Sequence, residues 1–319
     1  MAFYLPLLQP HFKHIEMGDT LTSLWSGCGS IVECMLDAEP CVIKAIKIPS
    51  YINHPKIKQS EFALKRKQQS YKVEYNFYRL YSAYLPTSAK SITCINAIND
   101  GDDYALVFKN FTQHGFAQAS ALDIKPILTW QAHFHAFNLN KPAKGLWQQG
   151  NYWHLSTRPD EFNKLKQSAD EKSDIKNAAH KIDKILQASH YKTLIHGDAK
   201  LANFAANEQS EILAYDFQYV GAGVGICDVM YFMTSCLSNE QLHTCADEYL
   251  RYYFSQLKNA LLVYQPQINA DDVIAKWHAL WPLAWADFYR FLAGWSPTHF
   301  KINSYMMAQV NLTLSDNNL

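Results

Sequence analysis

The stretch "TLIHGDAKLANFAANEQSEILAYDFQ", Thr193 to Gln218, places two carboxylates and one amide in a fixed order. Its segments "TLI" and "EILAY" are typical of short strands, and "NEQS" between them predicts a turn. Asp198 follows a glycine at the end of the first strand, Asn203 comes five residues later, and Asp216 ends the second strand. A hairpin of this length can fold back on itself, so we expect these three side chains to converge.

Two carboxylates and an amide oxygen suit a hard divalent cation such as Mg²⁺, which completes its coordination with phosphate and water. A carboxylate that stays free of the metal can orient an attacking hydroxyl group and accept its proton. This set of side chains is therefore typical of phosphoryl transfer. The alternative is a turn-rich hairpin that carries no chemistry.

The spacing His-x-Asp-x-x-x-x-Asn followed by Asp-Phe resembles the catalytic arrangement of the protein-kinase-like superfamily. His-Gly-Asp is similar to the form found in its aminoglycoside and choline kinase branch. Within that branch the chain resembles bacterial members of the ecdysteroid-kinase-like (choline-kinase-like) phosphotransferase family. The similar segments, which together cover most of the chain, are "LWSGCGS", "CVIKAIKIP", "RKQQSYKVEYNFY", "HGDAKLANF", "YDFQ" and "DFYRFLAGW".

The resemblance implies an α+β, bilobal protein-kinase-like fold: an N-terminal antiparallel β-sheet lobe with one main helix, then a larger, mostly helical C-terminal lobe. It also implies ATP and Mg²⁺ as cofactors and a hydroxyl group of a small molecule as acceptor. By this similarity Asp198 would be the catalytic base, and Asn203 and Asp216 would bind Mg²⁺. Asp216-Phe217-Gln218 departs from Asp-Phe-Gly, which puts in question a protein-kinase-style loop switch but not metal binding.

Lys200 forms an Asp-x-Lys with Asp198, which protein kinases also carry at this place. Its ammonium group would neutralise charge on the transferred phosphoryl group. The alternative is an exposed lysine paired with a nearby carboxylate.

The sequence pattern of the N-terminal third predicts a sheet whose strands are interrupted by one helix. Apolar residues at helical spacing predict that helix within Ser60 to Tyr84, and long helical patterns dominate from Ser120 onward. We therefore expect a nucleotide-binding lobe at residues 1–108 and a catalytic, acceptor-binding lobe at residues 109–319. Runs rich in β-branched residues predict strands at Ser30 to Leu36, Cys41 to Ile48, Ser91 to Ile98 and Tyr104 to Lys109.

In such a fold the first lobe supplies a lysine that holds the nucleotide phosphates and a helix carboxylate that positions it. Lys44 is a charge between Ile43 and Ala45 in an otherwise apolar strand, and its burial would be costly without a partner. Lys47 is the rival, but the family pattern of an apolar run, a lysine and then a proline favours Lys44. We expect an ion pair between Lys44 and Glu74 of the predicted helix. The alternatives are a lysine on the outward face of an edge strand and a solvent-facing Glu74.

Other segments are assigned by their position. Gly27 and Gly29 of "SGCGS" precede the strand that leads to Lys44 and could form a tight turn over the phosphates. Backbone groups from about Phe108 to Asn110 would bind an adenine edge. The glycine-rich "VGAGVG" at residues 220–225 lies after the metal-binding Asp, so we expect a flexible segment rather than a nucleotide cradle.

Two features of the helical half remain open. Asp228 resembles the aspartate that braces the catalytic loop in this branch, although a helix N-cap is nearly as good an interpretation.

His133 and His135 lie two residues apart on a predicted helix and so point in different directions, which favours core or surface histidines over a metal site.

The sequence says least about which molecule accepts the phosphoryl group. Acidic and aromatic side chains would hold a quaternary amine, whereas a steroid-like acceptor needs a broad apolar wall, and the sequence does not choose between them. Helical spacing favours a core stripe for most of the aromatic residues near the C-terminus, and some could instead line an acceptor pocket. These residues are Trp277, Trp281, Trp285, Phe288 and Trp295, with Asp287, Tyr289 and Arg290 among them.

Composition excludes several classes of function. Lys plus Arg and Asp plus Glu balance at 29 each in 319 residues, so no bulk charge would hold a nucleic acid or an anionic membrane. The seven cysteines form no Cys-x-x-Cys pair, and no run of about 18 apolar residues predicts a membrane span. With no export signal recognised, we expect a cytoplasmic protein that retains free thiols and has no obligate protein partner.

Two other functions stay open. A catalytically silent, kinase-like nucleotide-binding protein would be expected to have lost some of these residues, and all of them are present. Protein-kinase activity would need room to dock a peptide, whereas the chain passes from Asp216 into "CDVMYF" without an Ala-Pro-Glu segment. GTP is an alternative donor to ATP.

Overall fold

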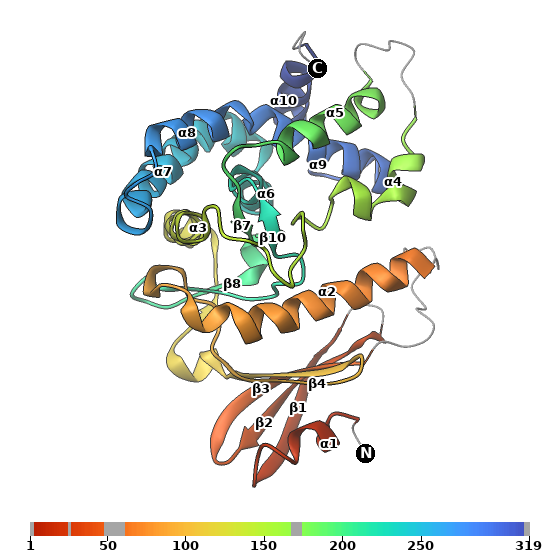
Figure 1. Cartoon of the computed structure of the whole chain (residues 1–319), viewed down its shortest axis with the longest axis vertical. Helices are drawn as coiled ribbons and strands as arrows, with labels where there is room; N and C mark the ends of the chain where they lie inside the picture. Colours follow the sequence, from red (N-terminus) through yellow and green to blue (C-terminus); the bar gives the residue numbers. More distant parts are fainter. Residues whose placement is uncertain (1–2, 25–26, 48–60, 167–173, 316–319) are drawn as a thin grey trace.

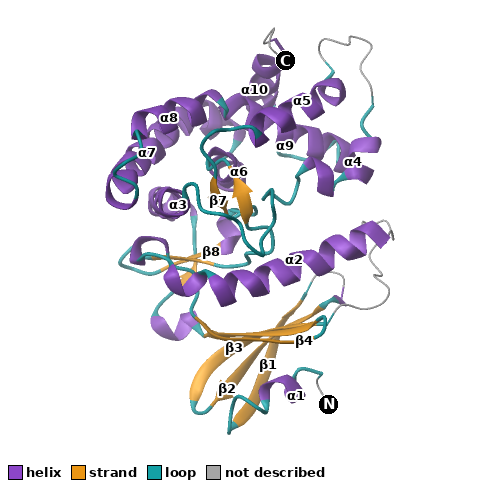
Figure 2. Cartoon of the chain, in the orientation of Figure 1, coloured by secondary structure: helices purple, strands orange, loops and turns teal. Residues whose placement is uncertain are grey.

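The computed structural model describes residues 3–24, 27–47, 61–166 and 174–315. Its N-terminal part is a five-stranded antiparallel sheet with the strand order β1-β2-β3-β5-β4 (Figures 1 and 2). The strands are β1 (Ile15–Ser23), β2 (Gly29–Leu36), β3 (Glu39–Ile46), β4 (Cys94–Asp100) and β5 (Asp103–Lys109). The central position of β3 means that Lys44 does not lie on an edge strand.

One helix covers each face of this sheet (Figure 1): α1 (Leu5–Leu8) on one side and the long α2 (Glu61–Leu80) on the other. Successive side chains of a strand point to opposite faces. Ile43 and Ala45 accordingly pack in the smaller core beneath α1. Lys44, between them, points to the opposite face, toward α2. The alternation of β3 therefore aims the lysine at the helix that carries Glu74.

The C-terminal part is mainly helical, and its core is continuous with the face of the sheet that α2 covers. In it, α3 packs along α7, and α9 packs against α4, α5, α6 and α10. The helices are α3 (Ile124–Asn138), α4 (Pro159–Asn163), α5 (Ile175–Gln187), α6 (Ile226–Cys236), α7 (Asn239–Tyr264), α8 (Ala270–Ala279), α9 (Trp281–Trp295) and α10 (Ser304–Ser315).

Short strands lie between the two parts and carry the segment from Thr193 to Gln218. The two strands predicted for this segment, β7 and β9, do not form one hairpin. Instead β7 pairs with β10, and β9 pairs with β8 in a small sheet of order β6-β8-β9. The bounds are β6 (Ala117–Gln118), β7 (Thr193–Ile195), β8 (Phe204–Ala206), β9 (Ile212–Ala214) and β10 (Gly221–Gly223).

The predicted elements are present with shifted ends. The strand expected from Ser91 begins at Cys94, and the helix expected to reach Tyr84 ends at Leu80, followed by a 3₁₀ turn. Ile48 and Ser60, the outer ends of two predicted elements, lie outside the described residues. Strand β1 was not predicted, because eight of its nine residues are exposed and its sequence has no apolar alternation.

The fold class is therefore confirmed as an α+β arrangement of an N-terminal antiparallel sheet followed by a larger helical part. Within the described ranges, no helix is long and apolar enough to cross a membrane.

Candidate active site

Lys44 joins the two parts of the molecule. Its Nζ lies 2.8 Å from Glu74 of α2 and 2.8 Å from Asp216 Oδ1, which follows β9. Lys44 is 6% exposed and Glu74 is 1% exposed, so water does little to screen these charges. The predicted ion pair between Lys44 and Glu74 is confirmed. Lys47 is exposed and pairs with Asp103 at 3.2 Å, which rules it out as the lysine facing α2.

An aromatic stack connects α2 to the loop that follows β7 and carries Asp198. The rings of Phe77 and Phe217 stack with their centroids 3.8 Å apart, and the His196 ring lies 4.4 Å from Phe217. All three side chains are fully buried. Because Phe217 follows Asp216 and His196 lies two residues before Asp198, the stack fixes both carboxylates relative to the helix that carries Glu74.

Asp198 lies at the centre of a polar cluster. Its Oδ2 accepts hydrogen bonds from Lys200 Nζ at 3.2 Å and from Asn203 Nδ2 at 3.1 Å, and its backbone carbonyl accepts a second one from Asn203 at 2.8 Å. Burial raises the pKa of Asp198; the Lys200 ammonium opposes this effect, and Asp216 adds to it. The result is a carboxylate of raised proton affinity that its neighbours hold in one orientation.

The two carboxylates around Lys44 differ in acidity. Burial raises the pKa of Glu74 to about 7, even though Lys44 opposes that rise. Burial acts in the same direction on Asp216, but the ammonium groups of Lys44, Lys200 and Lys67 outweigh it and hold its pKa well below the usual range. Asp216 is therefore the carboxylate that stays ionised at neutral pH, as a metal ligand must be.

The residues expected to hold Mg²⁺ have oxygen atoms to spare. Asn203 donates both of its described side-chain hydrogen bonds through Nδ2, and Asp216 is contacted by Lys44 and Gln218 only through Oδ1. Among the described residues, nothing hydrogen-bonds to Asn203 Oδ1 or Asp216 Oδ2. Asp216 also has a φ of 66°, an uncommon conformation for a residue other than glycine and one found at functional sites. This donor set fits a hard cation.

Gln218 is a site residue that sequence reasoning missed. Its Nε2 donates to Asp216 Oδ1 at 2.5 Å, and its Oε1 accepts from Lys67 Nζ at 2.9 Å and from Ser70 Oγ at 3.4 Å. Gln218 thus links Asp216 to α2. The departure from Asp-Phe-Gly was the signal that could have found it.

Asp228 of α6 braces the catalytic loop from below. Its Oδ2 accepts from the His196 amide at 2.6 Å, and its Oδ1 accepts from the Gly197 amide at 3.0 Å. His135 Nε2 lies 3.2 Å from the same carboxylate, and His135 Nδ1 lies 2.8 Å from the Tyr253 hydroxyl. The bracing role is confirmed, whereas the N-cap of α6 is Gly225.

The segment at residues 220–225 is not the flexible segment we expected. It includes β10, which pairs with β7, and its glycines make close contacts. A Cβ on Gly221 would lie 2.3 Å from the Trp147 carbonyl, and one on Gly225 would lie 2.5 Å from the Trp277 ring. The glycines therefore allow close packing against the catalytic loop's strand and the helical core.

The two glycines before β2 differ in their surroundings. Gly27 has a φ of 70° with open space around it, and Gly29 has a φ of 132°. A Cβ on Gly29 would lie 1.9 Å from the Ala45 carbonyl. Gly29 thus serves the pairing of β2 with β3, and Ser26 of the same motif lies outside the described residues. A phosphate-binding role for either glycine stays a prediction.

In the connection after β5, one of the backbone groups expected to bind adenine is already hydrogen-bonded, and the adenine-binding role of the others from about Phe108 to Asn110 stays a prediction. The Asn110 amide donates to the Pro40 carbonyl at 3.1 Å, and the Asn110 side chain caps the following 3₁₀ turn through Thr112. This amide is therefore not free to bind an adenine edge. Phe108 is buried, and its ring packs edge-on against Tyr78 of α2 with centroids 4.7 Å apart.

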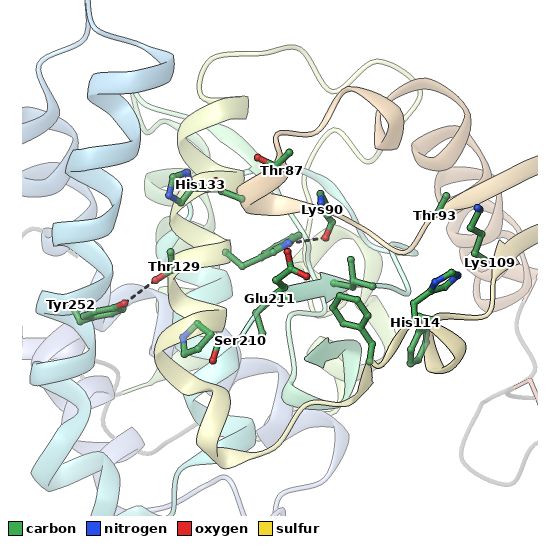
Figure 3. A pocket seen from close by; sticks show the side chains of 17 residues that line it. Thr87, Lys90, Thr93, Lys109, His114, Thr129, His133, Ser210, Glu211 and Tyr252 are labelled. Carbon is green, nitrogen blue, oxygen red and sulfur yellow. Dashed lines mark hydrogen bonds between the residues drawn. The ribbon is translucent and has the colours of Figure 1, made fainter. Parts of the chain in front are cut away.

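A cavity of about 630 Å³ lies beside this connection (Figure 3) and contains none of the catalytic residues expected above. Lys109 and His114 border it on one side, and Thr129 and Tyr252, which hydrogen-bond at 2.9 Å, close the other. Neither Lys44 nor Asp198 lines this cavity.

The other open features belong to the core. Trp277, Trp281 and Trp285 are buried, as the core stripe predicts, whereas Trp295 is 37% exposed. His133 and His135 hydrogen-bond to tyrosines of α7. In the described part of the chain, no group of three or more His, Cys, Asp or Glu side chains suits a metal ion. A cation bound by Asp216 and Asn203 would therefore complete its coordination with ligands from outside the protein.

Comparison with known proteins supports the resemblance over the part of the chain that carries Asp198 and Asp216. Residues 148–265 match the sequence model of the ecdysteroid kinase-like family. The matched stretch contains Asp198, Lys200, Asn203, Asp216 and Asp228, but not Lys44 or Glu74. No curated protein matches the sequence.

Solved structures extend the likeness to the whole fold. The amicoumacin kinase hAmiN, in complex with AMP-PNP, Ca²⁺ and Ami, has a TM-score of 0.52 at 12% identity, over 98% of this chain and 92% of that one. The AMP complex of LicA has a TM-score of 0.50 at 12% identity, over 97% and 94%. LicA is a choline kinase from Streptococcus pneumoniae. At these identities the likeness establishes the bilobal, protein-kinase-like fold.

Proposed function

We propose that this chain, a bilobal protein-kinase-like protein whose catalytic half matches the ecdysteroid kinase-like family, is a small-molecule kinase. It transfers the γ-phosphoryl group of ATP to a hydroxyl group of its acceptor and depends on Mg²⁺. The solved kinases of the same fold bind AMP-PNP with Ca²⁺ or AMP, which supports a nucleotide and a divalent cation here. The nucleotide-binding role of residues 1–108 belongs to the same proposal.

The observation that carries the proposal is the double contact of Lys44 with Glu74 and Asp216, both at 2.8 Å. A buried lysine held by two carboxylates needs a reason to be there, because two apolar residues would fill the space at lower cost. Holding nucleotide phosphates next to a metal site is such a reason.

Each residue has a distinct task in this proposal. Asn203 Oδ1 and Asp216 Oδ2 would hold Mg²⁺, which supplies charge neutralisation at the phosphates when bound. Lys44, positioned by Glu74, would hold the phosphates of the nucleotide. Asp198 would orient the acceptor hydroxyl and take its proton while the hydroxyl oxygen bonds to the γ-phosphorus and the bond to ADP breaks. Lys200, 3.2 Å from Asp198, would stabilise the charge on the transferred group.

Thermal unfolding with nucleotide tests the first half of the proposal. We expect ATP with Mg²⁺ to raise the melting temperature more than ATP with EDTA, and Asp216→Asn to abolish that difference. The matched control is Asp271→Asn, on an exposed part of α8. Equal stabilisation by ATP with and without Mg²⁺ would argue against the metal-binding roles of Asp216 and Asn203.

A screen of hydroxylated metabolites for ADP release tests the chemistry. Asp198→Asn should bind ATP as the natural chain does and lose at least 10²-fold in the rate of transfer, the usual contribution of a general base. Retained turnover would overturn the assignment of Asp198. Binding of ATP without turnover of any acceptor would instead favour the catalytically silent alternative.

A further inference from the structure

A lysine that the sequence motifs do not include packs against aromatic residues of α6 and α9. Lys301 belongs to the segment between α9 and α10, and its Nζ lies 4.5 Å from the centroid of the Tyr231 ring and 5.7 Å from that of Phe288. Its Nζ donates a hydrogen bond to Thr234 Oγ1 at 3.0 Å. No carboxylate of the described residues forms a salt bridge with it.

Lys301 is close enough to the catalytic carboxylate to respond to its charge. Burial lowers the pKa of Lys301 to about 8, and Asp198 opposes that effect while Lys200 adds to it. A half-buried ammonium group that has lost part of its hydration and has no anion of its own is a site that a bound anion would stabilise.

Two tyrosines connect Lys301 to a second cation. Burial and the Asp198 carboxylate raise the pKa of both Tyr231 and Tyr152, which places both phenol groups near that carboxylate. Their rings meet edge to face with centroids 5.3 Å apart. On the far side of the pair, the Arg158 guanidinium lies 5.6 Å from the Tyr152 ring and 5.1 Å from the Phe291 ring. Cations thus flank the tyrosine pair on both sides.

The acidic groups near Arg158 are Glu161 and Asp160, and a second guanidinium group shares them. Glu161 lies 3.5 Å from Arg158, but Arg66 of α2 brings another guanidinium to the same place, where it donates to the Thr157 carbonyl at 2.7 Å. Burial, and after it the charge of Arg158, lowers the pKa of Arg66. Two guanidinium groups that repel each other are typical of a place where an anion binds.

An aromatic ladder leads from this cluster to the surface. Phe291 stacks on Trp295 at 5.7 Å, Trp295 faces His299 at 5.7 Å, and His299 stacks on Phe300 at 4.7 Å. Trp295 is 37% exposed and Phe300 is 78% exposed. The ladder begins where α9 and α4 lie side by side (Figure 1). It offers flat apolar faces to a ligand whose other end reaches Asp198.

We propose that the acceptor is a hydroxylated carboxylate with an aromatic or alicyclic body, whose carboxylate lies between Lys301 and Arg158, over Tyr231 and Tyr152. Its apolar body contacts Trp295 and Phe300, and its hydroxyl faces Asp198. A quaternary amine would meet two cations here, so the arrangement selects against cationic acceptors. This inference rests on the proposed function, and it deepens that function by naming the class of acceptor.

A charge series of one alcohol tests the proposal by binding and by turnover. The probes carry the hydroxyl and the charged group on neighbouring carbons with the ring beyond them: mandelic acid, its methyl ester and (2-hydroxy-2-phenylethyl)trimethylammonium. Binding is measured by ligand-observed NMR with the natural chain in the presence of Mg²⁺ and AMP-PNP, and turnover by ADP release with ATP. We expect the acid to bind at least 10-fold more tightly than the ester and the ammonium compound not to bind.

Variants at the two cations locate the effect. Lys301→Met and Arg158→Met should each weaken binding of the acid about 10-fold and leave the ester unchanged, while Lys258→Met on the exposed face of α7 changes neither. Lys301→Met should leave the affinity for ATP unchanged. A loss of ATP affinity would show that Lys301 holds the nucleotide instead, and would overturn the proposal.

The remaining outcomes separate this inference from the kinase proposal. Equal or tighter binding of the ester or the ammonium compound, or no binding of the acid at millimolar concentration, overturns the carboxylate assignment. Turnover of an uncharged or cationic acceptor in the wider screen would also overturn the carboxylate assignment, but it would support the kinase function. Selective binding of the acid, with no ADP release from any hydroxylated acid, would support the anion site and contradict the kinase.

Discussion

Lys44 and Asp216 are 172 residues apart in the sequence, yet their side chains meet at 2.8 Å. The contact joins the central strand of the N-terminal sheet to the loop after β9. Because Lys44 also holds Glu74 at 2.8 Å, one ammonium group fixes the position of α2, the sheet and the catalytic half relative to one another. A change at any of the three should therefore affect both stability and the chemistry proposed here.

Replacing Lys44 should separate these two effects. Lys44→Met leaves Glu74 buried without its cation, so at pH 8 we expect a loss of about 3 kcal/mol in the free energy of unfolding, as for other broken buried ion pairs. The double variant Lys44→Met/Glu74→Leu should recover part of that stability, because the buried charge of Glu74 is gone and Asp216 keeps Lys200 and Lys67 as nearby cations. Neither variant should regain phosphoryl transfer. Urea unfolding and ADP release measure the two quantities.

The matched control for Lys44 is Lys47→Met. Lys47 is exposed and pairs with Asp103 on the surface, so its loss should change the free energy of unfolding by less than about 1 kcal/mol and leave transfer intact. If Lys47→Met abolished transfer and Lys44→Met did not, the assignment of the phosphate-holding lysine would be wrong.

Glu74 should make the stability of the nucleotide-free protein fall with rising pH. Its pKa of about 7 in the folded state lies above the ordinary value of about 4.3. Between these values the folded protein keeps a proton that the unfolded chain has released, so its stabilisation is complete below pH 4 and is lost as the pH rises to 7. At about 1.4 kcal/mol for each pKa unit, the loss is of the order of 3–4 kcal/mol.

Urea midpoints at several pH values between 5 and 8 measure this effect. Glu74→Gln cannot ionise and should flatten the decline, whereas Glu208→Gln, an exposed glutamate in the turn between β8 and β9, should keep it. Parallel curves for the natural chain and Glu74→Gln would mean that Glu74 is fully ionised throughout this range.

Local pattern was enough to predict the parts of the site that lie within single elements. Lys44 is recognisable because it is the one charge between apolar neighbours in β3, and Glu74 because it lies on the one helix that interrupts the strands. Asp198 and Asn203 do hydrogen-bond to each other, and the pairing of β8 with β9 links Asn203 to the segment that ends at Asp216, although the single hairpin expected here does not form. In each case the physical reason, a costly buried charge or a set of oxygen ligands, is visible in the sequence.

Features that depend on pairing between distant segments were missed. The pairing of β7 with β10 needs Gly221 and Gly223 to accept close neighbours, and a glycine-rich segment is equally typical of a flexible loop. Strand β1 is exposed along most of its length, so it has no hydrophobic period to detect. The bridge from Gln218 to Lys67 spans 151 residues, and only the tertiary structure brings the two together.

Gln218 should control how well Asp216 serves as a metal ligand. Its amide donates to Asp216 Oδ1 and leaves Oδ2 without a protein partner in the described chain. Gln218→Ala removes a hydrogen bond to a charged group, worth about 1.5–3 kcal/mol, so the concentration of Mg²⁺ needed for half-maximal stabilisation by ATP should rise about 10-fold. Thermal unfolding across a Mg²⁺ titration measures this concentration.

Gln187→Ala is the matched control for Gln218, because Gln187 is exposed and hydrogen-bonds to Asp183 on the surface of α5. It should leave the Mg²⁺ titration unchanged. An unchanged titration for Gln218→Ala as well would show that Asp216 is held sufficiently by Lys44 alone, and that Gln218 serves only to attach the loop to α2.

Asp228 should be required for the geometry of the catalytic loop, although it cannot touch the substrates from its fully buried position. Both of its oxygens accept backbone amides of the loop, from His196 and Gly197. Asp228→Asn presents an NH₂ group to one of those amides and leaves it without an acceptor. The cost of a buried amide without a partner is about 1–3 kcal/mol, and the His135 contact at 3.2 Å is weakened with it.

The loss frees one of the two amides that fix the position of the loop. Gly197 packs closely against the Tyr219 carbonyl, from which a Cβ would lie 2.0 Å away, so even a small shift of the loop disturbs this packing. A displacement of the loop carries Asp198 with it, so we expect the rate of transfer to fall at least 10-fold while ATP, held by Lys44, still stabilises the fold. Asp247→Asn, an exposed residue of α7, controls for the change of charge. Full activity in a destabilised Asp228→Asn would show that the brace stabilises the fold without setting the position of Asp198.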